Sequence, residues 1–268
     1  MKKIDKVAKD VLKIIKRKEY AKAQRAAEKG TKLYTPEQCE YLLAFKSDVT
    51  NENGCEIIVT NETTQVAAHR LVVKENVDNL VLLNFASGKH AGGGFLRGSK
   101  AQEEDLCRCS GLYNCLANSE NYYDYNVENK TPLYSDHTMY SPDVPWFRKS
   151  SKDKPGKMFL SSVITSPAPN AREYLRQNKD GQAELEEIVR HRAEIILAIA
   201  HHHQHRNLLL GAWGCGVFAN DPVFVANVFY ELLKGSFAKV FDNVTFAIYC
   251  ASESDELVLK AFQERFTI

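Results

Sequence analysis

Short apolar runs with the length of β-strands recur along the chain. Six of them stand out: 56–60, 80–86, 137–144, 158–165, 207–213 and 244–250. Several, such as LVLLNFA at 80–86, are apolar at consecutive rather than alternating positions. A strand with that pattern is buried on both faces of its sheet. The pattern therefore predicts strands inside a layered fold.

Helical patterns lie between these runs. Apolar residues recur at helical spacing in 102–118, 183–204, 222–234 and 254–265. Strands that alternate with helices are typical of an α/β sandwich with a mixed sheet. The sequence therefore predicts the α/β class, with helices flanking the sheet.

Two segments outside the helical patterns suggest how the chain is organised. Residues 1–29 are charged and indicate one or two helices, so we expect an N-terminal helical extension followed by one domain over 30–268. The segment 119–156 is polar and aromatic, although it includes the apolar run 137–144. We expect most of it to be a loop that is mobile or covers substrate.

Composition and charge exclude several classes of protein. The 268 residues are 44% apolar and 26% charged with net charge +1, so no overall field points to nucleic acid or membrane. Seven cysteines without a CxxC pair indicate a reduced, cytoplasmic protein. The N-terminus lacks the unbroken apolar run of a signal peptide, and no stretch approaches the about 20 apolar residues of a membrane span.

Two glycine-rich loops each follow a strand and precede a helix. The first covers 87–101, and the second covers 211–221 and ends with Asp221 as a good N-cap and Pro222 as a good first helical residue. Helix N-termini expose N–H groups, and glycines let the backbone approach an anion. In open α/β sheets, ligands lie at the carboxyl ends of strands. We therefore expect the two loops to grip a ligand that contains a pyrophosphate, although tight turns alone would also use glycines.

The glycine spacing excludes two common nucleotide-binding motifs. The second loop reads G-x-x-G-x-G, which is not the dinucleotide fingerprint, and neither loop has the Gly-Lys-Ser/Thr of a P-loop. A Rossmann oxidoreductase and a nucleotide kinase are therefore disfavoured.

Two adjacent glutamates, Glu103 and Glu104, begin the predicted helix after the first loop. Neighbouring helical residues point about 100° apart, so the two carboxylates cannot both face one bond. We expect a division of labour in which one carboxylate reaches the reacting bond and the other accepts hydrogen bonds from sugar hydroxyls. The helix dipole alone would also favour acidic residues here, but the nearby glycine triplet favours a site.

The combination is recognisable. Gly92-Gly93-Gly94, seven intervening residues and Gln102-Glu103-Glu104 resemble the catalytic signature of poly(ADP-ribose) glycohydrolases. The surrounding LLNFASGKHAGGGFLRGSKAQEEDLCRCSGLY resembles the bacterial-type branch of that family, as do the segments 139–148, 163–170 and 211–221. The resemblance covers about residues 30–250, nearly all of the predicted domain.

The resemblance implies a macrodomain-like three-layer sandwich that binds ADP-ribose. It implies hydrolysis of the ribose–ribose O-glycosidic bond of poly(ADP-ribose), from the chain terminus, with release of ADP-ribose. Glu104 matches the catalytic glutamate, and Glu103 matches the residue that holds ribose hydroxyls. The substrate-binding residues that it implies are Asn84, Gly92, Gly93, Gly94, Gln102, Gly214, Cys215, Gly216, Val217 and Phe218. Phe218 matches a ring that packs beside the ribose.

The chain departs from the family pattern in two places. Ser87 stands where many macrodomains place an asparagine, and His90-Ala91 replaces the Asn-Pro common before the triplet in bacterial relatives. Both departures concern the recognition of ribose rather than the acid chemistry.

The chemistry needs no cofactor and no metal. Cleaving an acetal requires protonation of the leaving oxygen, and one carboxylic acid can donate that proton and then deprotonate water. The histidines at 201–203 and His205 lie at a helix end, where cationic side chains suit the dipole and the surface, so we expect no metal site there. Cys107, Cys109 and Cys115 lack ligand spacing, and we expect them to pack in the core.

Two other functions remain open from the sequence. The same site could remove ADP-ribose from a protein side chain or a nucleic acid, or the chain could be a non-catalytic ADP-ribose-binding module. The intact Gln102-Glu103-Glu104 argues against the binding module, because binding alone does not require an acid.

Overall fold

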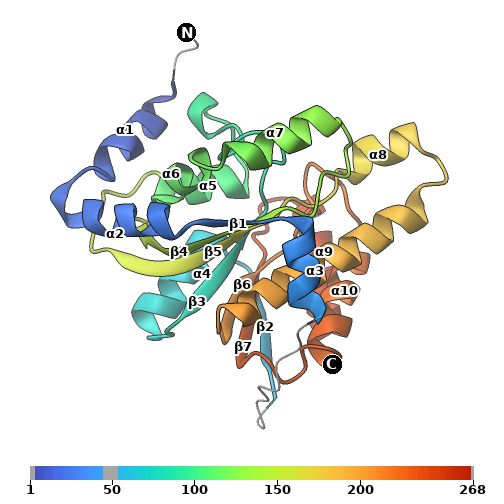
Figure 1. Cartoon of the computed structure of the whole chain (residues 1–268). Helices are drawn as coiled ribbons and strands as arrows, with labels where there is room; N and C mark the ends of the chain where they lie inside the picture. The colour runs from blue at the N-terminus through green and yellow to red at the C-terminus, as the bar shows by residue number, and fades with distance from the viewer. Residues whose placement is uncertain (1–3, 45–53, 267–268) are drawn as a thin grey trace.

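A seven-stranded mixed sheet forms the centre of the molecule in the computed structural model, which describes residues 4–44 and 54–266 (Figure 1). The strand order is β1-β4-β5-β3-β6-β7-β2. The five strands from β5 to β2 in this order run parallel to one another. At the other edge, β4 runs antiparallel to β5, and β1 runs antiparallel to β4. The strands are β1 (Lys32–Tyr34), β2 (Glu56–Thr60), β3 (Leu80–Asn84), β4 (Thr138–Trp146), β5 (Phe159–Thr165), β6 (Asn207–Leu210) and β7 (Asn243–Ala247).

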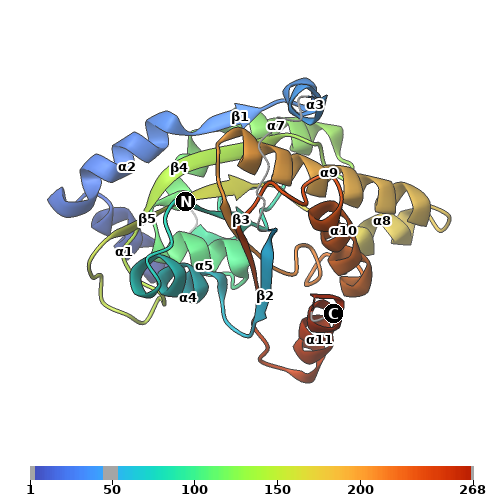
Figure 2. The ribbon, with the colours of Figure 1, turned by 90° about the horizontal axis from the view of Figure 1, so that it is seen from below.

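Helices cover both faces of this sheet, which confirms the predicted α/β sandwich. One face carries α3, α9, α10 and α11, and the other carries α1, α2, α4, α5 and α6 (Figures 1 and 2). The helices are α1 (Lys6–Ile14), α2 (Lys18–Gly30), α3 (Pro36–Ala44), α4 (Thr64–His69), α5 (Gln102–Cys109), α6 (Leu112–Ala117), α7 (Glu120–Asn129), α8 (Ala171–Gln177), α9 (Gln182–His202), α10 (Pro222–Lys234) and α11 (Glu253–Phe266), with a π-turn at Arg70–Lys74 and a 3-10 turn at Phe95–Arg97.

The central strand β3 is buried on both sides, as its unbroken apolar run predicts. Leu80 and Leu82 lie in the hydrophobic cluster beneath α5, whereas Val81 and Leu83 lie in the cluster beneath α9 and α10. Full burial of such a side chain contributes about 1.5–3 kcal/mol. This strand thus anchors both layers and fixes where its carboxyl end emerges.

The predicted helix over 102–118 is wrong in one respect, because it is two helices. Ser110 is extended and forms an isolated bridge with Trp146 of β4. The N–H of Gly111 donates to the Pro145 carbonyl at 2.9 Å. Pairing with a distant strand therefore ends α5 at Cys109.

The segment 119–156 is not a loop as a whole. It contains α7 and the whole of β4. Helix α7 buries Tyr122 and Asn126, and the Asn126 side chain accepts a hydrogen bond from the N–H of Ser135 at 2.8 Å. The expected loop is thus shortened to the residues between these elements and after β4.

The charged N-terminal segment forms two helices that pack on the rest of the protein. Helix α1 buries Ala8, Val11 and Ile14. In α2, the Gln24 amide donates to the Gly111 carbonyl at 3.0 Å. Of the helices formed by residues 4–44 and 54–266, none combines the length and apolar character needed to cross a membrane.

Two histidines after α9 pack against Tyr140, contrary to the expectation of a cationic surface. His203 stacks on Tyr140 with ring centroids 3.5 Å apart and hydrogen bonds to the Tyr34 hydroxyl at 2.8 Å. His205 is 2% exposed and lies between the Tyr140 hydroxyl and the Asn79 carbonyl. Across the described part of the chain, no group of three or more His, Cys, Asp or Glu side chains could hold a metal ion.

The half-buried imidazole of His203 should make the fold sensitive to acid. Burial, followed by the charges of His202, His205 and Lys32, lowers its pKa to about 4. A histidine with a lowered folded-state pKa takes up its proton more readily when unfolded, so stability is lost as the pH falls from about 6.5 to 4. We expect a loss of about 2 kcal/mol from this residue, after allowance for its partial exposure.

Urea unfolding of the protein and of His203→Phe at pH 7 and pH 4.5 measures this loss. Phenylalanine keeps a ring against Tyr140 but loses the hydrogen bond to Tyr34. The variant should be less stable at pH 7, and the difference in unfolding free energy between the two proteins should narrow at pH 4.5. A difference that stays constant would mean that His203 does not titrate in this range.

Candidate active site

Both predicted glycine loops open onto one cavity at the carboxyl edge of the parallel strands. The cavity has a volume of ≈ 770 Å³, which is in the range of small-molecule sites. Segments after β2, β3, β6 and β7 line it, together with the start of α5 and part of α11. The predicted position, at the carboxyl ends of strands, is confirmed as the location of this cavity.

The first loop needs glycine for a specific reason. Gly92 and Gly93 both have positive φ, at 64° and 58°. A Cβ on Gly93 would lie 2.5 Å from Glu104 Oε1 and 3.0 Å from Glu103 Oε2. The backbone of Gly93 therefore touches both carboxylates, and a larger residue would displace them.

Glu103 is held on both carboxylate oxygens. Oε1 accepts from the Asn84 amide at 3.1 Å, and Oε2 accepts from the N–H of Ser87 at 2.7 Å. Burial raises the pKa of Glu103 to about 8, although these two donors and the N–H of Gly92 lower it and the charge of Glu104 raises it. The side chain is 4% exposed. Glu103 is therefore fixed in place in a setting that resists its ionisation.

Glu104 has one anchored oxygen and one that faces the cavity. Oε1 accepts from the N–H of Gly94 at 2.7 Å. Oε2 has no hydrogen-bond partner within residues 4–44 and 54–266, and it is not among the buried unpaired oxygens. The side chain is 7% exposed and lines the cavity. The two glutamates thus meet different donors, as the division of labour requires.

Asn84 and Gln102 help to hold Glu103 and Glu104 in place. Asn84 is fully buried and also donates to Thr165 Oγ1 at 3.2 Å, so it acts on the cavity through Glu103. The Gln102 side chain accepts from the N–H of Phe85 at 2.9 Å and donates to the Leu83 carbonyl at 2.7 Å. These bonds tie the start of α5 to the end of β3. Direct contact of either residue with substrate stays a prediction.

The second loop, 214–218, lines the opposite wall. Gly214 has φ of 76°, and a Cβ there would lie 2.5 Å from both Ala168 Cβ and Asn220 Nδ2. Gly216 has open space around it. Asp221 caps α10 by accepting from the N–H of Val223 at 2.9 Å, as predicted. The loop therefore presents its backbone to the cavity beside a helix N-terminus.

Some lining residues were not found from the sequence. Tyr134 lies in the cavity wall with its ring 5.8 Å from Phe218, and it comes from the segment 119–156. Tyr249 and Val258 close the far end, after β7 and on α11. Two of them carry a weak signal in the sequence. Tyr249 stands near the end of the apolar run 244–250, and Tyr134 belongs to the aromatic segment 119–156 that we expect to cover substrate, whereas Val258 carries no signal.

The cysteines have the expected packing role. All seven cysteines are free. Cys107, Cys109 and Cys115 are buried, and burial raises the pKa of Cys109 and Cys115 to about 12. Thiols with so high a pKa stay protonated and are poor nucleophiles.

A mixed sheet with a ligand-sized cavity at its carboxyl edge, a glycine loop and a glutamate anchored on one oxygen only defines a macrodomain-like fold. The chain belongs to the microbial-type poly(ADP-ribose) glycohydrolase (PARG) family, since the family model "Microbial-type PARG, catalytic domain" matches residues 8–149. The predicted family and enzyme class are thereby confirmed.

Solved structures support the same assignment over almost the whole chain. PARG from Thermomonospora curvata is 40% identical with a TM-score of 0.91, covering 97% of this chain and 98% of that one. The same protein bound to the inhibitor ADP-HPD has a TM-score of 0.87 at the same identity and coverage. PARG from Deinococcus radiodurans in complex with ADP-ribose is 40% identical with a TM-score of 0.84, covering 91% of this chain and 97% of that one. A comparison with curated proteins finds no match.

Proposed function

We propose that this chain hydrolyses the ribose–ribose O-glycosidic bond of poly(ADP-ribose), with Glu104 as acid and base. The observation that carries the assignment of Glu104 is its Oε2 atom, which faces the cavity without a protein partner while Oε1 is anchored by Gly94. Glu103, held on both oxygens, is the supporting carboxylate. The related PARG structures with ADP-ribose and ADP-HPD support ADP-ribose as the bound unit.

The proposed reaction uses one carboxyl group twice. Protonated Glu104 donates to the departing ribose oxygen, and the resulting carboxylate then deprotonates the incoming water. On Glu103, the Asn84 amide and the N–H of Ser87 each occupy one acceptor site and leave another free, whether or not the carboxyl group is ionised. The remaining site can take a ribose hydroxyl and so orient the sugar beside Glu104.

The two loops divide the rest of the ligand between them. Backbone N–H groups of 214–218, beside the N-terminus of α10, suit the pyrophosphate. Phe218, in contact with Tyr134, supplies an aromatic wall beside the ribose. The glycine triplet then closes around the scissile bond, where both glutamates meet Gly93.

Product analysis tests this function. Purified protein is incubated with poly(ADP-ribose) and, separately, with mono-ADP-ribosylated protein and nucleic acid, and the products are separated by chromatography. We expect ADP-ribose from the polymer, released from the chain terminus. Release only from a mono-ADP-ribosylated acceptor would favour the alternative acceptor, and binding without any product would favour a binding module.

Activity should survive removal of metal ions. The described residues offer no metal-binding cluster, and Glu104 can perform both proton transfers. Hydrolysis of poly(ADP-ribose) measured after dialysis against a chelator should stay within about twofold of the untreated protein. A loss that added Mg²⁺ or Zn²⁺ restores would contradict the single-glutamate mechanism.

The domain boundary and the location follow as proposals. We propose a helical extension over 1–29, of which the structure describes α1 and α2, and a catalytic domain over 30–268; α1 and α2 pack on α5, α6 and β4. The seven free cysteines favour a reducing, intracellular location.

A further inference from the structure

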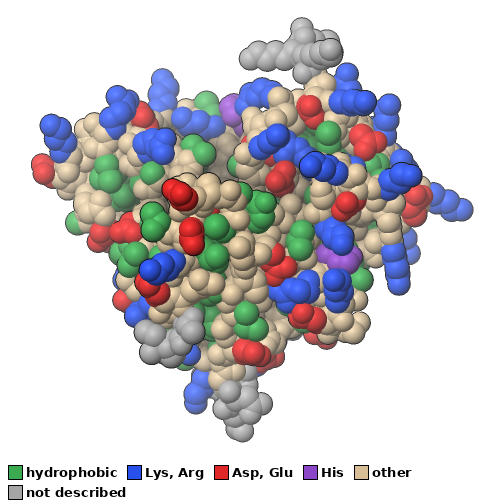
Figure 3. All heavy atoms as spheres, turned by 180° about the vertical axis from the view of Figure 1, so that it is seen from behind, with side chains coloured by type: hydrophobic (Ala, Val, Ile, Leu, Met, Phe, Trp, Pro, Cys, Tyr) green, Lys and Arg blue, Asp and Glu red, His purple; other side chains and the backbone are tan. Residues whose placement is uncertain are grey.

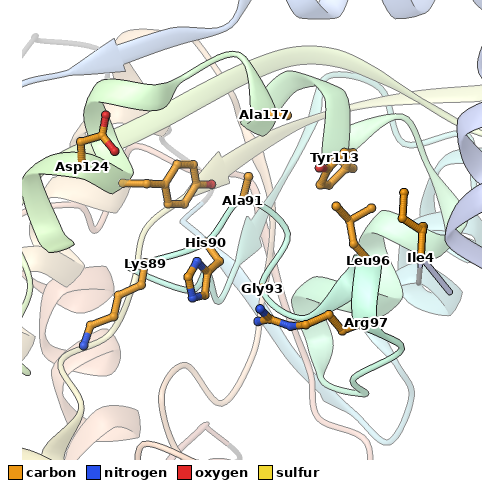
Figure 4. A pocket seen from close by; sticks show the side chains of 11 residues that line it. Ile4, Lys89, His90, Ala91, Gly93, Leu96, Arg97, Tyr113, Ala117 and Asp124 are labelled. Atoms are coloured by element: carbon orange, nitrogen blue, oxygen red, sulfur yellow. The ribbon is translucent and has the colours of Figure 1, made fainter. Parts of the chain in front are cut away.

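A second cavity lies beside the glycine loop (Figure 4). Its volume is ≈ 620 Å³. Three residues line both cavities: His90, Gly93 and Arg97. A chain bound in the first cavity can therefore continue into the second by passing over Gly93. The other lining residues are Ile4, Lys89, Ala91, Leu96, Tyr113, Ala117, Tyr123 and Asp124.

The entrance to this second cavity carries basic side chains that lack protein partners. Lys89, His90 and Arg97 are exposed, and within residues 4–44 and 54–266 their side chains make no hydrogen bond or ion pair. His90 and Arg97 point toward the same opening (Figure 4). Burial, followed by the charges of Arg97 and Lys89, lowers the pKa of His90. At neutral pH, two cations and one neutral imidazole thus stand along the rim of this cavity, with His90 between Lys89 and Arg97 (Figure 4), and this rim attracts anions.

The opposite end of the cavity has a different character. Ile4, Leu96 and Tyr113 form an apolar wall there (Figure 4). An aromatic ring beside aliphatic side chains suits a flat heterocyclic base. The cavity therefore combines cations at its entrance with an apolar end, which is the pairing that a nucleotide requires.

The basic N-terminal helices begin at the same cavity. Ile4 is in its wall, and the N–H of Asp5 donates to the Leu96 carbonyl at 2.9 Å. Residues 1–29 hold eleven Lys and Arg against four Asp and Glu, although the whole chain has a net charge of only +1. Figure 3 shows Lys and Arg side chains gathered over the side that carries α1 and α2. A polyanion leaving the cavity would meet this positive surface.

We propose that the second cavity is the subsite for the ADP-ribose unit on the leaving side of the cleaved bond. Lys89 and Arg97 bind the pyrophosphate of that unit, the apolar wall receives its adenine, and α1 and α2 attract the rest of the polymer. The proposal rests on the proposed function, because a bond between two units places one unit on each side of Glu104. The first cavity takes the terminal unit, and the next must lie across Gly93.

Two substrates with different leaving groups test the subsite. One is the ADP-ribose dimer, whose leaving unit carries a pyrophosphate, and the other is ADP-ribose joined at C1″ to 4-nitrophenol, whose leaving group carries none. For Lys89→Gln/Arg97→Gln, the ratio of kcat/KM for the dimer to that for the nitrophenyl compound should fall about tenfold at low salt. This ratio should also lose most of its dependence on salt.

The matched control is Lys234→Gln/Lys239→Gln, which removes two exposed lysines at and just after the C-terminal end of α10. Its ratio should equal that of the unmodified protein. A ratio unchanged in Lys89→Gln/Arg97→Gln, with both substrates hydrolysed, would overturn the subsite and leave the proposed function intact. Hydrolysis of neither substrate by the unmodified protein would overturn the proposed function itself.

Discussion

Glutamine in place of Glu104 is expected to lower the turnover of poly(ADP-ribose) by about 10²–10⁴-fold, and by more if one group serves both proton transfers. The amide keeps the shape of the side chain, and its oxygen can still accept from the N–H of Gly94. It cannot give a proton to the leaving oxygen or take one from water. Initial rates with poly(ADP-ribose), followed by the release of ADP-ribose, measure the effect.

Binding must be measured beside the rates. Calorimetric titration with ADP-ribose should give a Kd for Glu104→Gln within about threefold of the unmodified value, because the anchoring hydrogen bonds of the site remain. Glu256→Gln is the matched control, since Glu256 is an exposed glutamate in the first turn of α11. Its turnover should be normal. Turnover near normal in Glu104→Gln would remove the acid and base role from this residue.

The strands were predictable because consecutive apolar residues in the sequence indicate strands that are buried in the sheet. The consecutive apolar residues of 80–86 predict burial on both faces, and β3 sends Leu82 to one layer and Leu83 to the other. The strands stop earlier than the apolar runs, at Asn84, Leu210 and Ala247. The apolar residues beyond those ends line or support the cavity, so their hydrophobicity reflects the site rather than the sheet.

The missed elements depend on contacts that lie far apart in the sequence. Helix α5 ends at Cys109 because Ser110 pairs with Trp146, which the helical pattern of 102–118 cannot reveal. Strand β1 has three residues, which are too few to show a periodic pattern, and it forms by pairing with the edge strand β4. His203 looks like a surface residue until Tyr140 is found beneath it.

The candidate active site was predictable to the extent that its residues are close together in the sequence. The glycine triplet and the glutamates lie within thirteen residues of one another, and together they resemble one family. Tyr134 was missed because a segment between α7 and β4 brings it to Phe218. The second cavity was missed for the same reason, since Ile4 and Leu96 are joined only by folding.

Alanine in place of Gly93 is expected to reduce kcat/KM for poly(ADP-ribose) by about 10²-fold, because a displacement of about 1 Å at a reacting group has an effect of that size. The new Cβ would lie 2.5 Å from Glu104 Oε1, closer than real contacts allow, so the carboxylate or the loop must move. The φ of 58° at this position also disfavours alanine, by about 1–2 kcal/mol. Steady-state rates and thermal unfolding measure the two effects separately.

The matched control is Gly156→Ala, where the nearest atom to the new Cβ is the Phe147 carbonyl oxygen at 4.0 Å and φ is not positive. It should leave both activity and stability nearly unchanged. A double-mutant cycle then shows whether Gly93 acts through the acid. Once Glu104 is glutamine, adding Gly93→Ala should lower the residual rate by less than about threefold, because residues that act as a unit are not additive. A full hundredfold loss in the double variant would mean that the Gly93 backbone serves the reaction independently of Glu104.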